Sequence, residues 1–179
     1  QLALVALLSF SLLCIPIWVQ ISKRIGKKAC YMIGMSIMAA AVMLFSLLGK
    51  SLGPAFGVIV MGFAGVGLST HYVMPHSILP DIVEYDAVTR NKGRREGVFS
   101  SLWTFSSKLG QALALALNGW ILALFGYHSE QITELAQIGI ILICGPLPLL
   151  WYLAGLWILR TYPIDRAYYE HLIATREAP

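Results

Sequence analysis

The order of apolar and polar residues along the chain predicts five membrane-spanning helices. Long apolar runs alternate with short polar connections, and a spanning helix needs about 20 mostly apolar residues because each residue rises about 1.5 Å. The predicted spans are Gln1 to Ile21, Ala29 to Leu48, Ala55 to Leu79, Gly97 to Phe125 and Leu135 to Leu159. We therefore expect an all-α integral membrane bundle over residues 1–161, followed by a tail over residues 162–179.

The composition agrees with a membrane protein. Hydrophobic residues make up 58% of the chain and charged residues only 12%, whereas charged residues make up about a quarter of a soluble globular domain. The net charge is +4, but the basic residues lie in short segments between apolar runs, which is typical of topology signals. We therefore expect the lipid bilayer as a partner and no nucleic acid.

The basic residues also predict an orientation. Eleven of the thirteen Lys and Arg residues lie in the connections 22–28 and 80–96 and in the tail from Arg160 onward. Connections rich in Lys and Arg face the cytoplasm. We therefore expect a multi-pass protein of the plasma (inner) membrane with these three segments, and hence the C-terminus, on the cytoplasmic side.

The sequence lacks the common motifs of enzymes and cofactor sites. It contains no HExxH, GxSxG, Walker A or GxGxxG pattern. Cys14, Cys30 and Cys144 have no metal-ligand spacing and are interpreted as buried hydrophobic residues. We therefore expect no enzyme, no metal and no cofactor. Because the chain begins at Gln1 without a methionine, we expect it to be a piece of a longer protein.

One predicted span carries a charge near its middle. Lys108 lies about 17 Å along the helix that starts at Gly97, where a charged residue costs roughly 2.5 to 3.5 kcal/mol to insert. At three- or four-residue steps from it, or their sums, lie Ser101, Thr104, Gln111 and Asn118. Such residues share one side of a helix. This polar stripe indicates either hydrogen bonding between helices or a transport pathway. Lys108 has no intramembrane carboxylate in this chain, so we expect its partner in another segment.

The connection between the first two spans has two interpretations. Its sequence "SKRIGKK", residues 22–28, is a basic topology signal with a turn at Gly26. It also resembles the end of the major facilitator loop signature, although the acidic residue and the leading glycine of that pattern are absent. The matching positions are Lys23, Arg24, Gly26, Lys27 and Lys28.

A longer run has a more specific likeness. The sequence "ILPDIVEYDAVTRNKGRREGVFSSLWTFSSKLGQAL", residues 78–113, resembles the glycoside-pentoside-hexuronide:cation symporter family of melibiose and glucuronide carriers. A Pro-Asp-x-Val-Glu-Tyr-type run, a basic Arg-x-Glu-Gly-type connection and a Lys-x-Gly helix follow in that family's order. The tail "YPIDRAYYEHLIA", residues 162–174, is similar to that family's ending. The likeness implies that the five helices are the eighth to twelfth of a twelve-helix major facilitator fold.

The resemblance also implies a function. The chain would be the C-terminal part of a secondary active transporter that carries a glycoside together with Na⁺ or H⁺, its coupling cation, by alternating access. The missing N-terminal half would be its partner and would hold most of the cation-binding carboxylates. Lysophospholipid carriers share the same superfamily segment, so a lipid or lysolipid carrier is an alternative. A non-transporting membrane assembly subunit and a membrane enzyme are further alternatives.

Candidate substrate and coupling residues follow from the stripe and the resemblance. They are Lys108, Thr104, Trp103, Tyr72 and Gln111. The resemblance places Tyr72 and Thr104 where the family lines its sugar site, and Lys108 is expected to pair with carboxylates of the facing half. For Trp103 and Tyr72 the alternative is packing. We expect His71 and His76 to be hydrogen-bonded packing residues, and Ser69, Tyr72 and His76 to share one helix face.

A cytoplasmic gate is expected in the connection 80–96. Its acidic residues Asp81, Glu84 and Asp86 stand against basic residues at 90, 92, 94 and 95. Exposed ion pairs contribute about 0 to 1 kcal/mol each, which suits a switch that forms in one state and breaks in the other. The gate residues predicted are Asp81, Glu84, Arg94 and Arg95. The alternative is a solvated loop whose charges only set the orientation.

Overall fold

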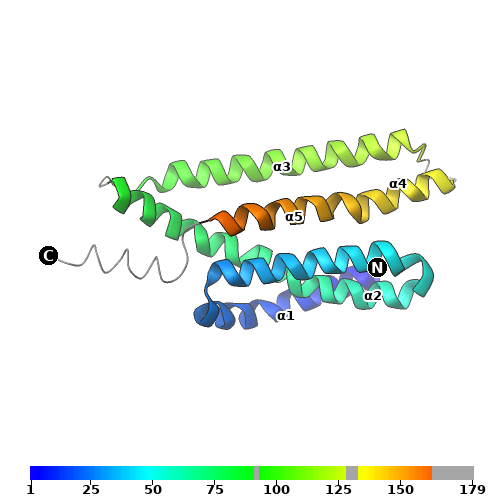
Figure 1. The fold of residues 1–179 in the computed structure, drawn as a ribbon, viewed down its shortest axis with the longest axis horizontal. Coiled ribbons are helices and arrows are strands. Elements are labelled where there is room, and N and C mark those ends of the chain that lie inside the picture. Colours follow the sequence, from blue (N-terminus) through cyan, green and yellow to red (C-terminus); the bar gives the residue numbers. More distant parts are fainter. Residues whose placement is uncertain (91–92, 128–132, 163–179) are drawn as a thin grey trace.

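The computed structural model is a bundle of long helices and describes residues 1–90, 93–127 and 133–162 (Figure 1). The helices are α1 (Leu2–Ile25), α2 (Lys27–Arg90), α3 (Glu96–Leu124), α4 (Glu134–Cys144) and α5 (Pro146–Thr161). The described residues form no strand, so the expected all-α class is confirmed. The expected tail from residue 163 onward lies outside the described residues.

The first two helices fold into three antiparallel segments. Gly26 ends α1 with a positive φ of 88°, a conformation that residues other than glycine rarely adopt, so the expected turn lies there. Within α2 the backbone is non-helical at Gly53, which divides it into the segments Lys27–Gly49 and Ser51–Arg90. Figure 1 shows the two segments running in opposite directions beside α1.

Small residues allow these segments to pack closely. Gly34 lies directly against the side chain of Thr70, and a Cβ atom at position 34 would overlap the Thr70 hydroxyl. Thr70 is fully buried and donates its hydroxyl to the Gly67 carbonyl at 2.7 Å. The Trp18 indole of α1 donates to the carbonyl of Val66 in α2 at 3.0 Å. Close backbone approach through small residues is a general way in which membrane helices associate.

The last span is broken in its middle. Its sequence contains Pro146 and Pro148, and prolines inside a span predict a kink or local unwinding. α4 ends at Cys144, Gly145 is non-helical, and Pro146 begins α5. Proline is tolerated at the first position of a helix because the N–H that it lacks has no intrahelical partner there. The hydroxyl of Thr133 caps α4 by accepting from the Ala136 N–H at 3.2 Å.

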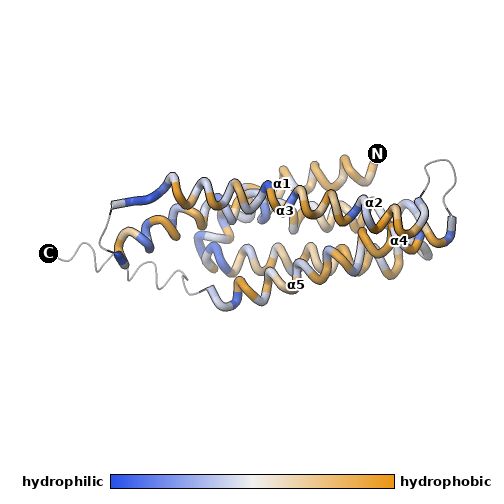
Figure 2. The backbone as a smooth tube through the Cα atoms, turned by 90° about the horizontal axis from the view of Figure 1, so that it is seen from above, coloured by the Kyte–Doolittle hydropathy of each residue, from blue (hydrophilic) through white to orange (hydrophobic). Residues whose placement is uncertain are grey.

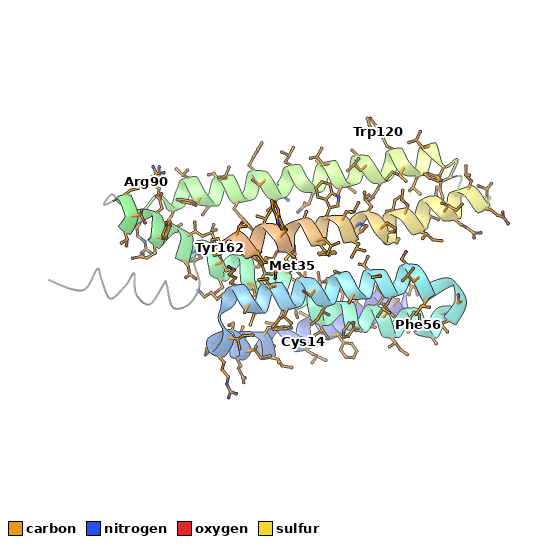
Figure 3. All side chains as sticks on the ribbon, viewed as in Figure 1. Cys14, Met35, Phe56, Arg90, Trp120 and Tyr162 are labelled. Carbon is orange, nitrogen blue, oxygen red and sulfur yellow. The ribbon has the colours of Figure 1, made fainter. Side chains whose placement is uncertain are left out.

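The outermost helix is α3. In Figure 1 it lies on the far side of α4 and α5 from α1, and none of its residues is buried. Ser107, Leu117 and Asn118 are among its half-buried residues, which mark the side that faces the bundle. Trp120, on the other side, is 73% exposed (Figure 3).

Four helical stretches in the described residues are long and apolar enough to cross a membrane. They are Leu2–Ile25, Lys27–Gly49, Ser51–Arg90 and Glu134–Thr161. α3, with 29 residues, is long enough but is not among them, because its polar stripe lowers its hydropathy. Figure 2 shows the mostly hydrophobic helices and the hydrophilic segment that precedes α3.

The connection predicted at 80–96 is largely helical. α2 continues through Pro80 to Arg90, so Asp81, Glu84 and Asp86 lie on its last turns, and the solvated-loop alternative for these residues is wrong. Proline weakens helical hydrogen bonding around it because it lacks an N–H. In that same turn, the Ser77 carbonyl accepts a hydrogen bond from the Lys27 ammonium at 2.8 Å.

Candidate functional site

The polar stripe of α3 is exposed along most of its length. The side chains of Ser101, Thr104, Lys108 and Gln111 are exposed, and Asn118 is half-buried. The Thr104 hydroxyl donates to the Ser100 carbonyl of its own helix at 2.9 Å. The stripe therefore does not join α3 to the other described helices, and hydrogen bonding within this bundle does not account for it.

Lys108 has no ion-pair partner among the residues that the structure describes. It lies twelve residues after the start of α3 at Glu96, which is about 18 Å along the helix axis. In the described part of the chain, the carboxylates that form ion pairs are all at residues 81–96. A cation at this depth is costly unless it faces water or an anionic partner.

The predicted aromatic residue of α3 points elsewhere. At 3.6 residues per turn, Trp103 lies about 140° around the helix from Lys108. Its ring meets the His76 ring of α2 edge-on, with centroids 6.0 Å apart. Trp103 is still 39% exposed. Of the four predicted substrate residues on α3, Trp103 thus lies on the side that contacts α2, whereas Thr104, Lys108 and Gln111 belong to the exposed stripe.

Tyr72 lies on α2 and is 56% exposed, whereas Ser69 is fully buried. Because α2 is helical here, Ser69, Tyr72 and His76 lie on one side of it by their spacing, and Ser69 is the buried member of that side. The Ser69 hydroxyl donates to the Val66 carbonyl of its own helix at 2.6 Å. His71 shares a hydrogen bond of 3.1 Å with the Tyr31 hydroxyl, in agreement with the packing role expected for this histidine.

The predicted gate residue Asp81 has a partner that the sequence did not reveal. The Lys27 ammonium, at the start of α2, donates to both of its carboxylate oxygens at 2.8 and 2.7 Å. The Asp81 side chain is only 15% exposed. The pair joins the α1–α2 turn to the later part of α2 across 54 sequence positions. The sequence did indicate that the two residues could meet, because both lie in segments expected on the same side of the membrane.

The other gate residues join the end of α2 to the start of α3. Arg95 donates to both oxygens of Asp86 at 2.8 to 3.0 Å, and Arg90 also pairs with Asp86 at 2.9 Å. Arg94 pairs with Glu84 at 3.0 Å. In each of these pairs the carboxylate side chain is at most 12% exposed, whereas the cation is at least 40% exposed.

We call these residues, together with Lys27 and Asp81, the ion-pair cluster. The cluster lies at the end of the bundle where α1 and α5 end and α2 both begins and ends (Figure 1). Lys92, another basic residue of this region, lies outside the described residues. The geometry brings the four predicted gate residues to one end of the bundle.

Comparison with known proteins identifies the family. The sequence pattern of the MFS/sugar transport protein family matches residues 1–166. The chain belongs to this family. The expected membership of the major facilitator superfamily is thereby confirmed, and with the apolar helices it makes the chain a part of a multi-pass membrane protein.

Three relatives illustrate the range within the family. The chain is 31% identical to an uncharacterised symporter of Synechocystis sp. over 88% of its length and 30% of that protein. It is 26% identical to the human sodium-dependent lysophosphatidylcholine symporter 1 over 92% of its length and 31% of that protein. It is 29% identical to a sphingosine-1-phosphate transporter of Xenopus tropicalis over 92% of its length and 32% of that protein.

The chain therefore spans about a third of the length of these relatives. The names of all three describe transport, and two of them name symport. The lipids in the last two names lie outside the glycoside class that the central run suggested. Family membership alone therefore does not assign a substrate class.

Proposed function

We propose that this chain is the C-terminal part of a secondary active transporter that couples substrate movement to a Na⁺ or H⁺ gradient. The observation that carries the proposal is Lys108. It is a single cation deep in an amphipathic helix, exposed, and without a carboxylate partner in the described bundle. Such residues in membrane helices mark substrate and ion pathways.

The exposed stripe of α3 is the proposed lining of that pathway. In transporters of this kind the substrate and coupling ion bind near the bilayer midplane, between two helical halves. In the proposed whole transporter, Lys108 faces carboxylates of the other half. Opposite charges in a poorly hydrated site strongly favour one another's ionised state. Binding of the coupling cation to those carboxylates would therefore compete with Lys108, which links ion occupancy to conformation.

A glycoside is the first proposed substrate class. Thr104 and Gln111, one turn on either side of Lys108, offer hydrogen-bonding groups on the same face. The hydroxyl groups of a sugar bind such side chains well. The family description, which names sugar transport, supports this class.

An amphiphile with a phosphate head is the second proposed class. The names of two relatives specify lipids that carry phosphate, and an exposed ammonium such as that of Lys108 is a suitable partner for phosphate. A shallow apolar recess along the first turns of α3, lined by Val98, Leu102 and Phe105 among others, continues from the stripe. An acyl chain could occupy a surface of that kind.

One experiment tests the function and separates the two classes. The full-length transporter is placed in proteoliposomes, and uptake of a labelled glycoside and of a labelled lysophospholipid is followed under an imposed Na⁺ or H⁺ gradient. Accumulation of either substrate above equilibrium supports the proposal and assigns the class. If neither gradient drives accumulation of either substrate, and neither substrate protects the variant Thr104→Cys from labelling, the proposed pathway is wrong.

We further propose that the ion-pair cluster lies on the cytoplasmic side and participates in gating. With the full-length protein in cells, the variants Ser51→Cys and Ser129→Cys should react with an impermeant reagent from outside, and Lys92→Cys only from inside. The reverse pattern would overturn the orientation. Lys27 and Asp81 lie on the two segments of α2. Their pair therefore biases the conformation only if these segments separate or if Asp81 changes its partner.

A further inference from the structure

Tyr162, the residue that follows α5, is fixed at the ion-pair cluster (Figure 3). Its side chain packs against a core of buried residues from α1 and α2. This core consists of Trp18, Cys30, Met74 and Ile78. The Tyr162 carbonyl accepts a hydrogen bond from the Lys28 ammonium at 2.5 Å, and the same ammonium donates to the Arg160 carbonyl at 3.1 Å. The end of α5 is thus attached to Lys28, the direct neighbour of Lys27.

The hydroxyl of Tyr162 is buried and has no hydrogen-bond partner among the described residues. Buried polar groups are almost always hydrogen-bonded, and a buried donor without a partner destabilises the conformation in which it occurs. In the observed arrangement, the Tyr162 hydroxyl therefore lacks a hydrogen bond within the described part of the chain. A group that is unsatisfied in one state of a moving protein is a natural source of bias toward another state.

Asp81 is the carboxylate whose charge acts on this hydroxyl. Burial, and secondly the charge of the Asp81 carboxylate, raise the pKa of the Tyr162 phenol to about 12. The phenol is therefore protonated at physiological pH and can donate a hydrogen bond. In the observed state, Asp81 is bonded to Lys27 through both oxygens. Ile78, one turn before Asp81 on α2, belongs to the core that the Tyr162 ring contacts.

We propose that Tyr162 is the alternative partner of Asp81, and that its hydroxyl binds the carboxylate when Lys27 releases it. This inference rests on the proposed gating role of Asp81. It makes Tyr162 a positioning residue that does not touch the substrate. An exchange between two partners within the chain allows the cluster to rearrange without leaving a half-buried carboxylate unpaired, which would be costly. The position of the end of α5 then depends on whether Lys27 and Asp81 are paired.

Cys30 provides a local reporter for the test. It is fully buried in the core that Tyr162 covers, so its labelling requires that this part of the structure opens. In the full-length protein, Cys14→Ala and Cys144→Ala leave Cys30 as the cysteine of this segment, and any cysteines elsewhere are likewise replaced. The rate of labelling by a membrane-permeant maleimide is then compared between the parent and the variant Tyr162→Phe.

The rate of Cys30 labelling is expected to fall about tenfold in Tyr162→Phe. Labelling needs the open state, and this state loses its hydrogen bond to the charged Asp81 carboxylate, which is stronger than a neutral hydrogen bond. The substitution removes the unsatisfied hydroxyl from the observed state and removes the bond to Asp81 from the other state. Both changes favour the observed state. An unchanged or faster rate would overturn the proposal. Tyr127→Phe, the same chemical change at the opposite end of the bundle, serves as the control and should leave the rate unchanged.

A double-mutant cycle tests whether Tyr162 acts through Asp81. In the background Asp81→Ala, the further change Tyr162→Phe should alter the rate less than about twofold, in contrast to the roughly tenfold effect in the parent. An effect that persists in full would show that Tyr162 acts through packing alone, and the proposal fails. If Asp81→Ala does not fold, Asp81→Asn replaces it, and the effect should be clearly smaller than in the parent because the acceptor is neutral.

This readout does not depend on transport. If the cycle succeeds while no substrate accumulates, the exchange of partners stands and the proposed transport function is wrong. If substrate accumulates but the cycle shows no coupling, the transport function stands and the role of Tyr162 is rejected.

Discussion

The packed part of the molecule, α1 and α2, contrasts with α3. Gly34 contacts Thr70 between the two segments of α2, and Trp18 joins α1 to α2 through its hydrogen bond to the Val66 carbonyl. α3 contributes no buried residue and carries the polar stripe. Both regions belong to one bundle, but of the two only the first contains buried residues in the described part of the chain.

The proposed function accounts for this difference by assigning different tasks to the two regions. A helix that only supports the fold can use small residues and apolar contacts throughout. A helix that lines a pathway must keep polar groups available, so it gives up apolar packing and hydropathy. α3 is the one helix of spanning length in the described residues that lacks the apolarity expected of a span, and it is the helix that contains Lys108.

The largest effect is expected from Lys108→Ala in the full-length transporter. Cation-driven accumulation should be abolished, so that the internal substrate concentration does not exceed the external one. The reason is that the carboxylates proposed for the facing half would lose their competing charge. Membrane insertion should be intact, since the roughly 2.5 to 3.5 kcal/mol penalty of the charge is removed. Uptake of labelled substrate under a Na⁺ or H⁺ gradient measures this effect.

The control for Lys108 is Lys50→Ala, which removes the other basic residue outside the three basic segments. It should transport normally. Parent-level accumulation by Lys108→Ala would show that the stripe is a passive surface, and the contrast between α3 and the packed helices would lose its functional meaning.

The next effect concerns packing and compares two glycines. Gly34→Leu should lower the stability of the detergent-solubilised protein by about 1 to 3 kcal/mol, because overpacked side chains force neighbours out of place. A Cβ atom added at Gly110 of α3 would meet nothing within 4 Å. Gly110→Leu should therefore change stability little. Thermal unfolding midpoints of the two variants measure the difference, and equal losses would contradict the division between the two regions.

A smaller effect is expected at the ion-pair cluster. Asp81→Asn keeps a hydrogen-bond acceptor for Lys27 but removes the charge, so it should shift the balance of states by about 1 to 2 kcal/mol, which is roughly tenfold. Substrate turnover should slow more than equilibrium binding weakens, because the proposed gate biases the balance of states without contacting the substrate. Turnover and binding are measured separately on the same preparation. Weaker binding at normal turnover would assign Asp81 a different role.

Local features of the fold were largely predictable from the sequence. Apolar runs predict the helices, Gly26 predicts the first turn, and Pro146 predicts the break in the last span. The stripe around Lys108 was also visible, because helical periodicity depends only on spacing along the chain. These features have in common that neighbouring residues determine them.

Features that depend on distant residues were not predictable in the same way. The helix was expected to end before Pro80, but α2 continues to Arg90, where ion pairs hold its last turns. The pairing of Asp81 with Lys27 joins segments 54 positions apart. Trp103 was grouped with Lys108 although helical geometry separates them, and only its contact with His76 showed which side faces α2. Tertiary contacts decide such cases, and a single sequence does not specify them.

The smallest effect is expected at the link between the two regions, where Arg94 pairs with Glu84 of α2 and, at 3.4 Å, with Glu96 of α3. The Arg94 side chain is 53% exposed, and exposed ion pairs contribute about 0 to 1 kcal/mol. Arg94→Gln should therefore change turnover by about twofold or less, with the effect disappearing at high salt because exposed charges are screened. Turnover of Arg94→Gln and Asp81→Asn is compared at low and high ionic strength. A loss at Arg94 as large as that at Asp81 would show that α3 is fixed to the packed helices through this link, and that the two regions move as one.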